Sequence, residues 1–222
     1  MVIAIDGPAG SGKGTLAKEL AKRLNLVNID TGATYRCVAL KVLRNNISIN
    51  DEDEIIEIAR SIDIDLLKDG RVLLDKEDVT KEIRSKEVTS IVSPISSIVK
   101  VREIMVDIQR KIAQGKDVVM EGRDITTVVF PEAEYKFYLD ASVEVRAERR
   151  YKENLEKGID TSYEEVLKSI QERDYNDMHK KVGSLMRTDE QIYIDSTNLT
   201  IDEEVAIVEK VIRGEYDEKN DR

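Results

Sequence analysis

The sequence predicts an α/β protein of three layers, in which helices cover both faces of a five-stranded parallel sheet. Short apolar runs alternate with helical patterns along the chain, and a glycine-rich loop joins the first run to the first helix. One stretch, residues 62–84, instead has the alternating period of an antiparallel hairpin. The 222 residues therefore suffice for a single domain, 1–222, with that stretch as a small inserted lobe.

Composition narrows the class of protein further. The formal net charge of −10 at pH 7 argues against a nucleic-acid surface, which needs a cationic stripe. The single cysteine, Cys37, excludes an internal disulfide. No apolar run has the length of a membrane span, and Met1 leads directly into the first strand. We expect a cytoplasmic monomer that binds neither nucleic acid nor membrane, with a solvated tail at residues 215–222.

The first apolar run, residues 2–5, leads into a loop with four glycines in nine residues, and a helix follows. Glycines let successive N–H groups point inward, and the helix start adds unpaired donors and the positive end of its dipole. This pattern predicts a site for the phosphates of a nucleoside triphosphate, although a glycine-rich turn without a ligand is the alternative. The ATP-binding candidates are Gly7, Pro8, Ala9, Gly10, Ser11, Gly12, Lys13, Gly14 and Thr15.

Two residues of this loop have particular roles. Lys13 should reach the outer phosphates as a compact positive charge. The hydroxyl that helps to hold Mg²⁺ arrives one place later than in the general pattern, because Gly14 follows the lysine and Thr15 carries the hydroxyl. The metal is then expected to be held more through water than by direct ligation.

The second apolar run, residues 26–29, predicts a short buried strand, and a helix with Tyr35 and Arg36 follows it. In open parallel sheets ligands gather at the carboxyl ends of strands. Asp30, Thr31 and Arg36 should therefore lie at the same edge as the phosphate loop. A surface arginine is the alternative for Arg36.

Residues 51–61 have a helical pattern, after which the period changes. Residues 62–66 alternate strictly, an Asp-Gly turn follows, and an apolar run returns at 72–74, which predicts a hairpin. A segment at 79–83 is a candidate third strand. The inserted lobe, 62–84, is small enough to move against the core.

The next long helix is expected to begin at a cap formed by Ser96 and Ser97 and to end at Gly115, with Arg102 beside its apolar stripe. A third core strand at 117–120 then ends in the motif Glu121-Gly122-Arg123-Asp124. Burying charged side chains at the end of a core strand costs free energy, so this motif indicates a functional site. A surface turn with a local ion pair is the alternative.

A fourth strand at 135–139 leads into a helix with Arg146, Arg149 and Arg150, a pattern that usually means solvated charge. Thr161 and Glu164 have the spacing of a capping box that starts another helix. The charge-dense region at about residues 157–187 has the composition of a mobile lid. A fifth strand at 191–194 precedes a last helix, which Thr200 and Glu203 should cap.

The charged residues indicate phosphoryl transfer, which is catalysed mainly by positioning and by cationic groups. A GTPase would need the motif Asn-Lys-x-Asp, and no asparagine in this chain is followed by lysine. A phosphate acceptor is already ionised and needs no general base, so we assign His179 no catalytic role. The cations available to surround a donor and an anionic acceptor are Arg36, Arg102, Arg123, Arg173, Lys180 and Arg187.

Eight short motifs occur in order along almost the whole chain: Ile5–Thr15, Asp30–Arg36, Glu87–Thr89, Val101–Glu103, Gly122–Asp124, Leu139–Ser142, Glu172–Asp174 and Asp195–Thr197. The first motif would fit any nucleoside monophosphate kinase. The complete set resembles the bacterial cytidylate kinases of that group.

This resemblance implies a P-loop kinase fold with a core, a monophosphate-binding lobe enlarged by the antiparallel insert, and a helical lid. It also implies ATP-dependent phosphorylation of CMP and dCMP to CDP and dCDP. By position the resemblance assigns catalysis to Lys13, Arg123, Arg173 and Lys180. It assigns further ATP contacts to Arg146 and Arg150, and metal binding to Thr15 and Glu121. The residues that it assigns to substrate binding are Asp30, Thr31, Arg36, Ser93, Arg102, Asp124 and Asp177.

Within this set, the cytosine ring would be recognised by Ser93, Arg102 and Asp124, and the sugar would be contacted by Asp177. Cytosine offers an amine donor beside two acceptors, which a carboxylate and an arginine match, whereas uracil turns an oxygen toward the carboxylate.

Several residues depart from the family pattern. Lys180 stands where a lid arginine is usual, and a lysine cannot fork across two phosphate oxygens, so Arg187 is the alternative. Ser184 replaces a proline of the lid, Thr126 replaces a glycine after the Gly-Arg-Asp motif, and Glu121 replaces an aspartate. Rival functions are a kinase for UMP, AMP or a phosphorylated metabolite, a nucleotide-binding regulatory module with slow turnover, and an ATP-driven nucleic-acid motor, which the acidity disfavours.

Overall fold

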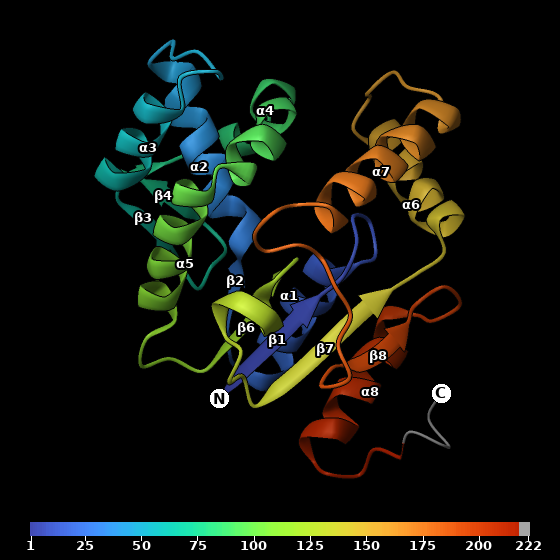
Figure 1. The fold of residues 1–222 in the computed structure, drawn as a ribbon. Coiled ribbons are helices and arrows are strands. Elements are labelled where there is room, and N and C mark those ends of the chain that lie inside the picture. Colours follow the sequence, from blue (N-terminus) through green and yellow to red (C-terminus); the bar gives the residue numbers. More distant parts are fainter. Residues whose placement is uncertain (218–222) are drawn as a thin grey trace.

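A parallel sheet of five strands runs through the middle of the protein in the computed structural model, which describes residues 1–217 (Figure 1). The strand order is β2-β6-β1-β7-β8, and every neighbouring pair is parallel, as the alternation of strands and helices predicts. The bounds are β1 (Val2–Asp6), β2 (Val27–Asp30), β6 (Val118–Gly122), β7 (Tyr135–Asp140) and β8 (Ile192–Asp195).

The register of the strands aligns the polar residues that follow the apolar runs. Asp6 on β1 lies beside Gly122 on β6, and Asp30 on β2 lies beside Glu121 on β6. Since these three strands end together, the loops that leave them meet at one edge of the sheet.

Separate hydrophobic clusters cover the two faces of the sheet. On one face, Leu16 and Leu20 of α1 (Lys13–Leu24) pack with Val205 and Val208 of α8 (Ile201–Ile212) against β1, β6, β7 and β8. On the other face lie α2 (Thr31–Arg44), α3 (Glu52–Ser61) and α5 (Val99–Ala113). The fold is therefore the expected three-layer arrangement of helix, sheet and helix.

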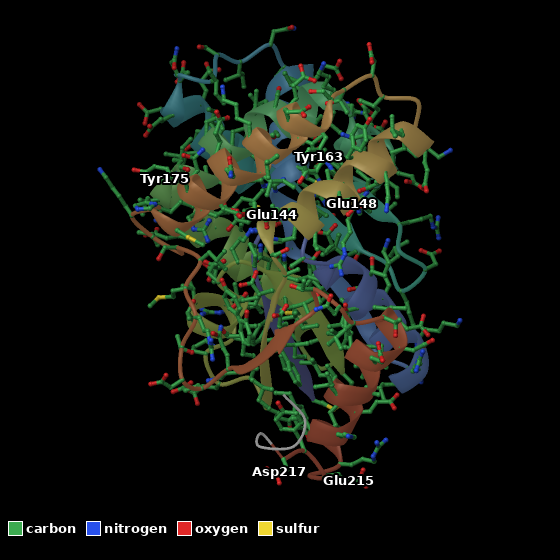
Figure 2. The ribbon with its side chains drawn as sticks, turned by 90° about the vertical axis from the view of Figure 1, so that its right-hand side faces the viewer. Glu144, Glu148, Tyr163, Tyr175, Glu215 and Asp217 are labelled. Carbon is green, nitrogen blue, oxygen red and sulfur yellow. The ribbon has the colours of Figure 1, made fainter. Side chains whose placement is uncertain are left out.

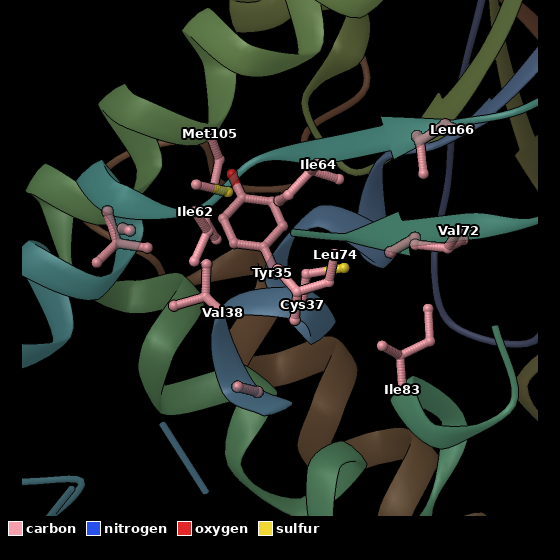
Figure 3. Close-up of a cluster of buried hydrophobic side chains, with 14 of the residues drawn as sticks. Tyr35, Cys37, Val38, Ile62, Ile64, Leu66, Val72, Leu74, Ile83 and Met105 are labelled. Atoms are coloured by element: carbon pink, nitrogen blue, oxygen red, sulfur yellow. The ribbon is translucent and has the colours of Figure 1, made fainter. Parts of the chain in front are cut away.

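The inserted lobe is a three-stranded antiparallel sheet of β3 (Ile64–Leu66), β4 (Val72–Leu74) and β5 (Glu77–Asp78). Its apolar side chains pack on α2, where Tyr35, Cys37 and Val38 face them (Figure 3). The hairpin is thus confirmed, with Ile64 opposite Leu74.

The prediction of a third strand at 79–83 was wrong. The third strand is β5, just before that segment, and the chain then forms the 3₁₀ turn η1 (Glu82–Arg84). Val79 and Ile83 are both buried. The N–H of Ile83 donates to the carbonyl of Val79 at 3.0 Å, a bond between residues four apart that a helical turn makes and an extended strand does not.

The predicted cap at Ser96 and Ser97 was also wrong. These residues end a helix that the sequence reasoning missed, α4 (Lys86–Ser97), which Ser85 caps at its start. Both serine hydroxyls donate to the carbonyl of Ser93 in the preceding turn, at 3.0 and 2.9 Å. Serine hydroxyls can bond backward as well as forward, so their presence alone does not fix which end of a helix they mark.

A helical hairpin of α6 (Val143–Glu156) and α7 (Tyr163–Met178) stands on the other side of the carboxyl edge from α2 and α4 (Figure 1). It has a small apolar cluster of its own, formed by Ala147, Val166 and Ile170. The capping box lies one residue later than predicted, at Ser162 and Glu165.

The last helix is capped by Thr200 and Glu203 as predicted. Within residues 1–217, none of the helices combines the length and apolar character needed to cross a membrane. Residues 218–222 of the expected tail at 215–222 lie outside the described residues.

Candidate active site

The phosphate loop, residues 7–15, connects β1 to α1 at the carboxyl edge of the sheet. Gly10 and Gly12 have φ of 77° and 98°, in the left-handed region that glycine adopts readily. Gly7 meets a different constraint, because a Cβ there would lie 2.0 Å from the carbonyl oxygen of Leu139 on β7. The glycines therefore allow both the curvature of the loop and its close approach to the sheet.

Lys13 is folded over this loop. Its Nζ donates to the carbonyl oxygen of Pro8 at 2.7 Å and to the Ser11 hydroxyl at 3.4 Å. Burial and, after it, the positive charge of Arg123 lower the pKa of Lys13 to about 7, against the opposing effect of Glu121. A lysine in these surroundings gains from a nearby anion, because an anion favours its charged form.

Asp30 organises the end of β2. Its Oδ1 accepts the N–H of Ala33 at 3.2 Å and so caps α2, while its Oδ2 accepts from Arg36 at 2.6 Å and from Arg84 at 3.0 Å. Burial opposes ionisation of Asp30, but the two guanidinium groups outweigh it and lower the pKa. Thr31 donates its hydroxyl to the carbonyl of Glu121 at 2.8 Å, which ties β2 to β6.

Glu121 carries a carboxylate next to the phosphate loop. A Cβ at Gly14 would lie 3.5 Å from its Oε1. Burial raises the pKa of Glu121, and the charge of Asp30 raises it further. Thr15, next to Gly14 at the start of α1, is exposed. Glu121 and Thr15 are thus oxygen donors on either side of the same stretch of loop.

A groove beside these residues runs between α1 and the inserted sheet, with a volume of about 710 Å³. Gly14, Asp30 and Glu121 line it at the phosphate loop, and Arg84 lines it at the insert. The edge of the sheet is therefore open to molecules that enter between core and insert.

Arg102 and Asp124 form a buried ion pair across from the phosphate loop. Arg102 also donates Nη1 to the carbonyl of Ser96 at 3.1 Å, and its guanidinium carbon lies 5.5 Å from the ring centroid of Tyr35. Ser93 is half-buried on α4, one turn before Ser96. The pair lies between α4, α5 and β6, and its two charged groups present a donor and an acceptor side by side.

Asp177 joins α7 to the core. Its Oδ2 accepts from Nε of Arg123 at 2.6 Å, and its Oδ1 accepts from Nζ of Lys180 at 2.9 Å. Burial opposes ionisation of Asp177, but Arg123 and Lys180 outweigh it, so the pKa lies well below its usual range. Lys180 also donates to the Ser96 hydroxyl at 3.2 Å, which connects the end of α7 to α4.

The remaining predicted arginines lie in different surroundings. Arg173 on α7 keeps an exposed surface, yet desolvation by the surrounding protein and, after it, the positive charge of Arg123 lower its pKa to about 10. Arg146 is buried and donates Nη1 to the carbonyl of Ala9 at 2.9 Å. Arg150 is exposed and pairs with Glu153 at 3.1 Å. Arg187, the alternative to Lys180, instead lies over the ring of Tyr193, 4.2 Å from its centroid.

Sequence reasoning missed the support beneath the Gly-Arg-Asp motif. Asp6 is fully buried and accepts the N–H groups of Ile125 and Thr126 at 2.8 and 2.9 Å, as well as the Thr126 hydroxyl at 2.6 Å. Gln191 donates to the Thr126 hydroxyl oxygen at 2.5 Å. Thr126 thereby fixes the start of the π-helical turn η2 (Ile125–Val129). An acid at the end of a buried strand was the available signal.

Gly183 was also missed. It has φ of 64°, and a Cβ there would lie 2.1 Å from Nη2 of Arg102 and 2.2 Å from Oδ2 of Asp124. The coil after α7 thus places its main chain directly on the buried ion pair. A lone glycine in a charge-dense segment gave no indication of this approach.

Arg149 is a third missed residue. It donates Nη2 to the carbonyl of Ser196 at 2.7 Å and Nη1 to the Ser196 hydroxyl at 3.1 Å. That hydroxyl in turn donates to the carbonyl of Ser11 at 3.2 Å. Arg149 therefore supports the phosphate loop from behind.

The sequence is similar to known proteins over almost its whole length. The cytidylate kinase family model matches residues 3–214. The chain is 55% identical to a cytidylate kinase of Caldanaerobacter subterraneus subsp. tengcongensis over 212 residues, covering 95% of this chain and 94% of the relative. It is 47% identical to a cytidylate kinase of Clostridioides difficile, with 96% of each chain covered.

Among solved structures, a shikimate kinase from Bacteroides thetaiotaomicron matches with a TM-score of 0.50 at 13% identity, covering 96% of this chain and 98% of that one. At this identity the match concerns the fold, and it agrees with the expected P-loop kinase architecture.

The buried Lys13 predicts a pH dependence of stability. Its pKa of about 7 in the fold is below the ordinary lysine value of 10.5, so between these pH values the unfolded chain binds more protons and stability rises with pH. In urea unfolding from about pH 6 to about pH 9, the wild type should gain stability relative to Lys13→Met as the pH rises above 7. The exposed Lys18→Met is the control and should follow the wild type; equal slopes for Lys13→Met and the wild type would contradict this assignment.

Proposed function

The chain belongs to the cytidylate kinase family, and from this premise we propose that it transfers the γ-phosphoryl group of ATP to CMP and dCMP, with ADP and CDP or dCDP as products. The observation that carries the proposal is the buried pair of Arg102 and Asp124, which lies at the same edge of the sheet as the phosphate loop. A phosphate cradle and a paired donor and acceptor for a base are the two halves of a nucleotide kinase site.

The donor binds on the phosphate loop. Its N–H groups and the start of α1 face the phosphates, and Lys13 moves from the carbonyl of Pro8 to the outer phosphates. Lys13 then exchanges two neutral oxygen partners, the Pro8 carbonyl and the Ser11 hydroxyl, for the charged oxygens of the phosphates. Arg146 and Arg150 lie on α6 beside the loop, and in this proposal Arg150 is the one free to reach the nucleotide because Arg146 is committed to the main chain of Ala9 and Ala141.

The acceptor phosphate is held by arginines from three elements. Arg36 comes from α2, Arg123 from the end of β6 and Arg173 from α7. Asp30 orients Arg36 at 2.6 Å, and Asp177 orients Arg123 at 2.6 Å. Thr31 and Asp177 supply further polar contacts to the acceptor, with Asp177 on the sugar.

Arg102 and Asp124, together with Ser93, read the base. The Asp124 carboxylate accepts from the amine of cytosine, and the Arg102 guanidinium donates to the neighbouring ring nitrogen and carbonyl oxygen. Uracil would place an oxygen against the carboxylate, so it is bound less well. Because both groups are buried, the discrimination is not weakened by competing water.

The chemistry needs positioning and positive charge. An oxygen of the acceptor phosphate attacks the γ-phosphorus, a new P–O bond forms, and the bond to the β-phosphate oxygen breaks to release ADP. Negative charge spreads over the transferred group, and Lys13, Arg123, Arg173 and Lys180 stabilise it. The attacking oxygen is already ionised, so no residue has to remove a proton.

Mg²⁺ fits the donors beside the loop. The residues that the structure describes contain no group of three or more His, Cys, Asp or Glu that could hold a metal on their own. Mg²⁺ prefers oxygen and usually keeps several waters while binding one or two carboxylates and the substrate phosphates. Glu121 and Thr15 are suitable oxygen donors, and the raised pKa of Glu121 shows that its carboxylate would gain from a cation. The ion would neutralise charge on the transferring phosphates.

The first prediction concerns turnover itself. In a coupled assay of ADP release across CMP, dCMP, UMP and AMP, the protein should be fastest with CMP and dCMP. Lys13→Ala should lower kcat by about 100-fold or more while the fold is retained, because a charge that acts on the transferring group is lost. Lys18→Ala, an exposed lysine on the same helix, is the control; ADP release that is independent of any monophosphate would support the rival regulatory module instead.

A second prediction concerns the base. Asp124→Asn replaces the carboxylate by an amide that can donate to uracil, so the preference for CMP over UMP in kcat/KM should fall by about 5- to 150-fold. Asparagine also leaves Arg102 a hydrogen-bonding neighbour, which Asp124→Ala would remove. Asp107→Asn on the exposed face of α5 is the matched control. An unchanged ratio of the two kcat/KM values would refute the assignment.

A third prediction separates the two lid cations. Lys180 contacts Asp177 and α4, whereas Arg187 stacks on Tyr193. Lys180→Ala should lower kcat by about 100-fold, and Arg187→Ala should change it by less than about threefold. Single-turnover kinetics with saturating substrates would measure both. The reverse ranking would assign the lid cation to Arg187.

A further inference from the structure

Asp174 lies about one turn before the end of α7 and is one of the few buried carboxylates among residues 1–217, with 8% of its surface exposed. Its Oδ1 accepts the N–H of Ala9 at 3.3 Å, and its Oδ2 accepts from Nη1 of Arg146 at 2.6 Å. Ala9 belongs to the phosphate loop. A side chain of α7 is thus bonded to the main chain of the donor site.

Arg146 completes this connection. The same Nη1 donates to the carbonyl of Ala9 at 2.9 Å, and Nε donates to the carbonyl of Ala141 at 2.9 Å. Both backbone groups of Ala9 are therefore held by one carboxylate and one guanidinium. Next along the loop, a Cβ at Gly10 would meet the main chain and Cβ of Arg146 at 3.3 Å, so the loop also packs on α6. A charged pair whose partners are satisfied in this way resists being broken.

One turn further along α7, Asp177 makes the corresponding contacts on the acceptor side. It accepts from Arg123 and Lys180 at 2.6 and 2.9 Å. Asp174 and Asp177 are three residues apart, so both project from the same side of the helix. Arg173, which the proposed function places on the phosphates, is adjacent to Asp174 in the same turn. Figure 2 shows α7 beside α6, with Tyr163 and Tyr175 marking the length of α7.

We propose that Asp174 is a positioning residue that couples donor binding to acceptor binding through α7. It holds the helix to Ala9, so a movement of the phosphate loop on binding ATP moves Asp174 and carries Arg173 and Asp177 with it. A single turn of helix transmits such a movement because its backbone is hydrogen-bonded throughout. Asp174 itself contacts neither substrate. The inference rests on the proposed function, because it requires two nucleotide sites.

The test measures the coupling between the two sites. The affinity for CMP is measured by titration calorimetry with and without a saturating non-hydrolysable ATP analogue and Mg²⁺, for the wild type and for Asp174→Asn. The amide is the same size as the carboxylate, but only one of its two terminal atoms is an acceptor, so its NH₂ group would face either the Ala9 N–H or the Arg146 guanidinium. We expect the analogue to tighten CMP binding by about fivefold or more in the wild type, the lower end of ordinary coupling. In Asp174→Asn this factor should fall below about twofold.

Three further variants make the test decisive. Glu172→Gln on the same helix is the control, because its carboxylate is exposed and its ion-pair partner, Lys168, lies on α7 itself; it should keep the wild-type factor. Asp174→Glu restores the charge and should recover part of the coupling. If Asp174→Asn fails to fold, Arg146→Lys tests the same contact, since lysine cannot bond Ala9, Ala141 and Asp174 together, and it too should reduce the factor.

The possible results separate the two proposals. If the wild type binds both ligands without coupling, or if Asp174→Asn and Arg146→Lys keep the full factor, the role of Asp174 is overturned while the proposed function stands. A purely structural role would lower the melting temperature and the affinities for both ligands. It would leave the coupling factor, which is the ratio of the CMP affinities with and without the analogue, unchanged, and that result also overturns the inference. A wild type that binds neither ligand would overturn the proposed function, and the inference with it.

Discussion

The site depends on one carboxylate between two cations. Asp177 accepts from Arg123, which leaves the end of β6, and from Lys180, which follows α7. Removing three charged groups from water is costly, and their attraction repays this only when the geometry is good and every donor has a partner. Here the distances are short and Lys180 also reaches Ser96. The same contacts that hold the end of α7 on the core therefore fix the direction of Arg123.

This arrangement explains how an acidic protein offers a basic site. The net charge is −10, yet Lys13, Arg36, Arg123 and Arg173 converge on one edge of the sheet. Part of their charge is balanced by Asp30 and Asp177, which act on Arg36 and Arg123 rather than on Lys13. Positive potential is therefore concentrated at the proposed phosphate site, although the net charge of the chain is negative.

Much of this could be predicted from the sequence because the patterns are local. The strands, the phosphate loop and the hairpin each follow from period, glycine spacing or turn chemistry within about ten residues. What escaped prediction depends on partners far along the chain. Ser96 and Ser97 could cap either of two helices, and only packing decides between them. The bond of Asp6 to Thr126 spans 120 residues, and Arg149 looked like a solvated arginine until the loop after β8 was placed against it.

The family resemblance assigned Arg102 and Asp124 to one site, which local sequence patterns could not do. Arg102 and Asp124 are 22 residues apart, and nothing in either neighbourhood indicates that they meet. Their pairing, their burial and their position opposite the phosphate loop come from how α5 packs along the sheet. Arg146 shows the opposite case, because its helical spacing suggested a solvated face and the structure commits it to the main chain beneath the loop.

Gly183 has a consequence for how selectivity can be altered. The coil after α7 touches the pair of Arg102 and Asp124 with main chain alone, at a distance that excludes even a methyl group. Any side chain introduced there would act as a spacer, and its size would set how far the coil stands off from the two charged groups. The depth of the proposed base pocket is thus adjustable from outside the pocket, by the volume of a single residue that takes part in none of its hydrogen bonds.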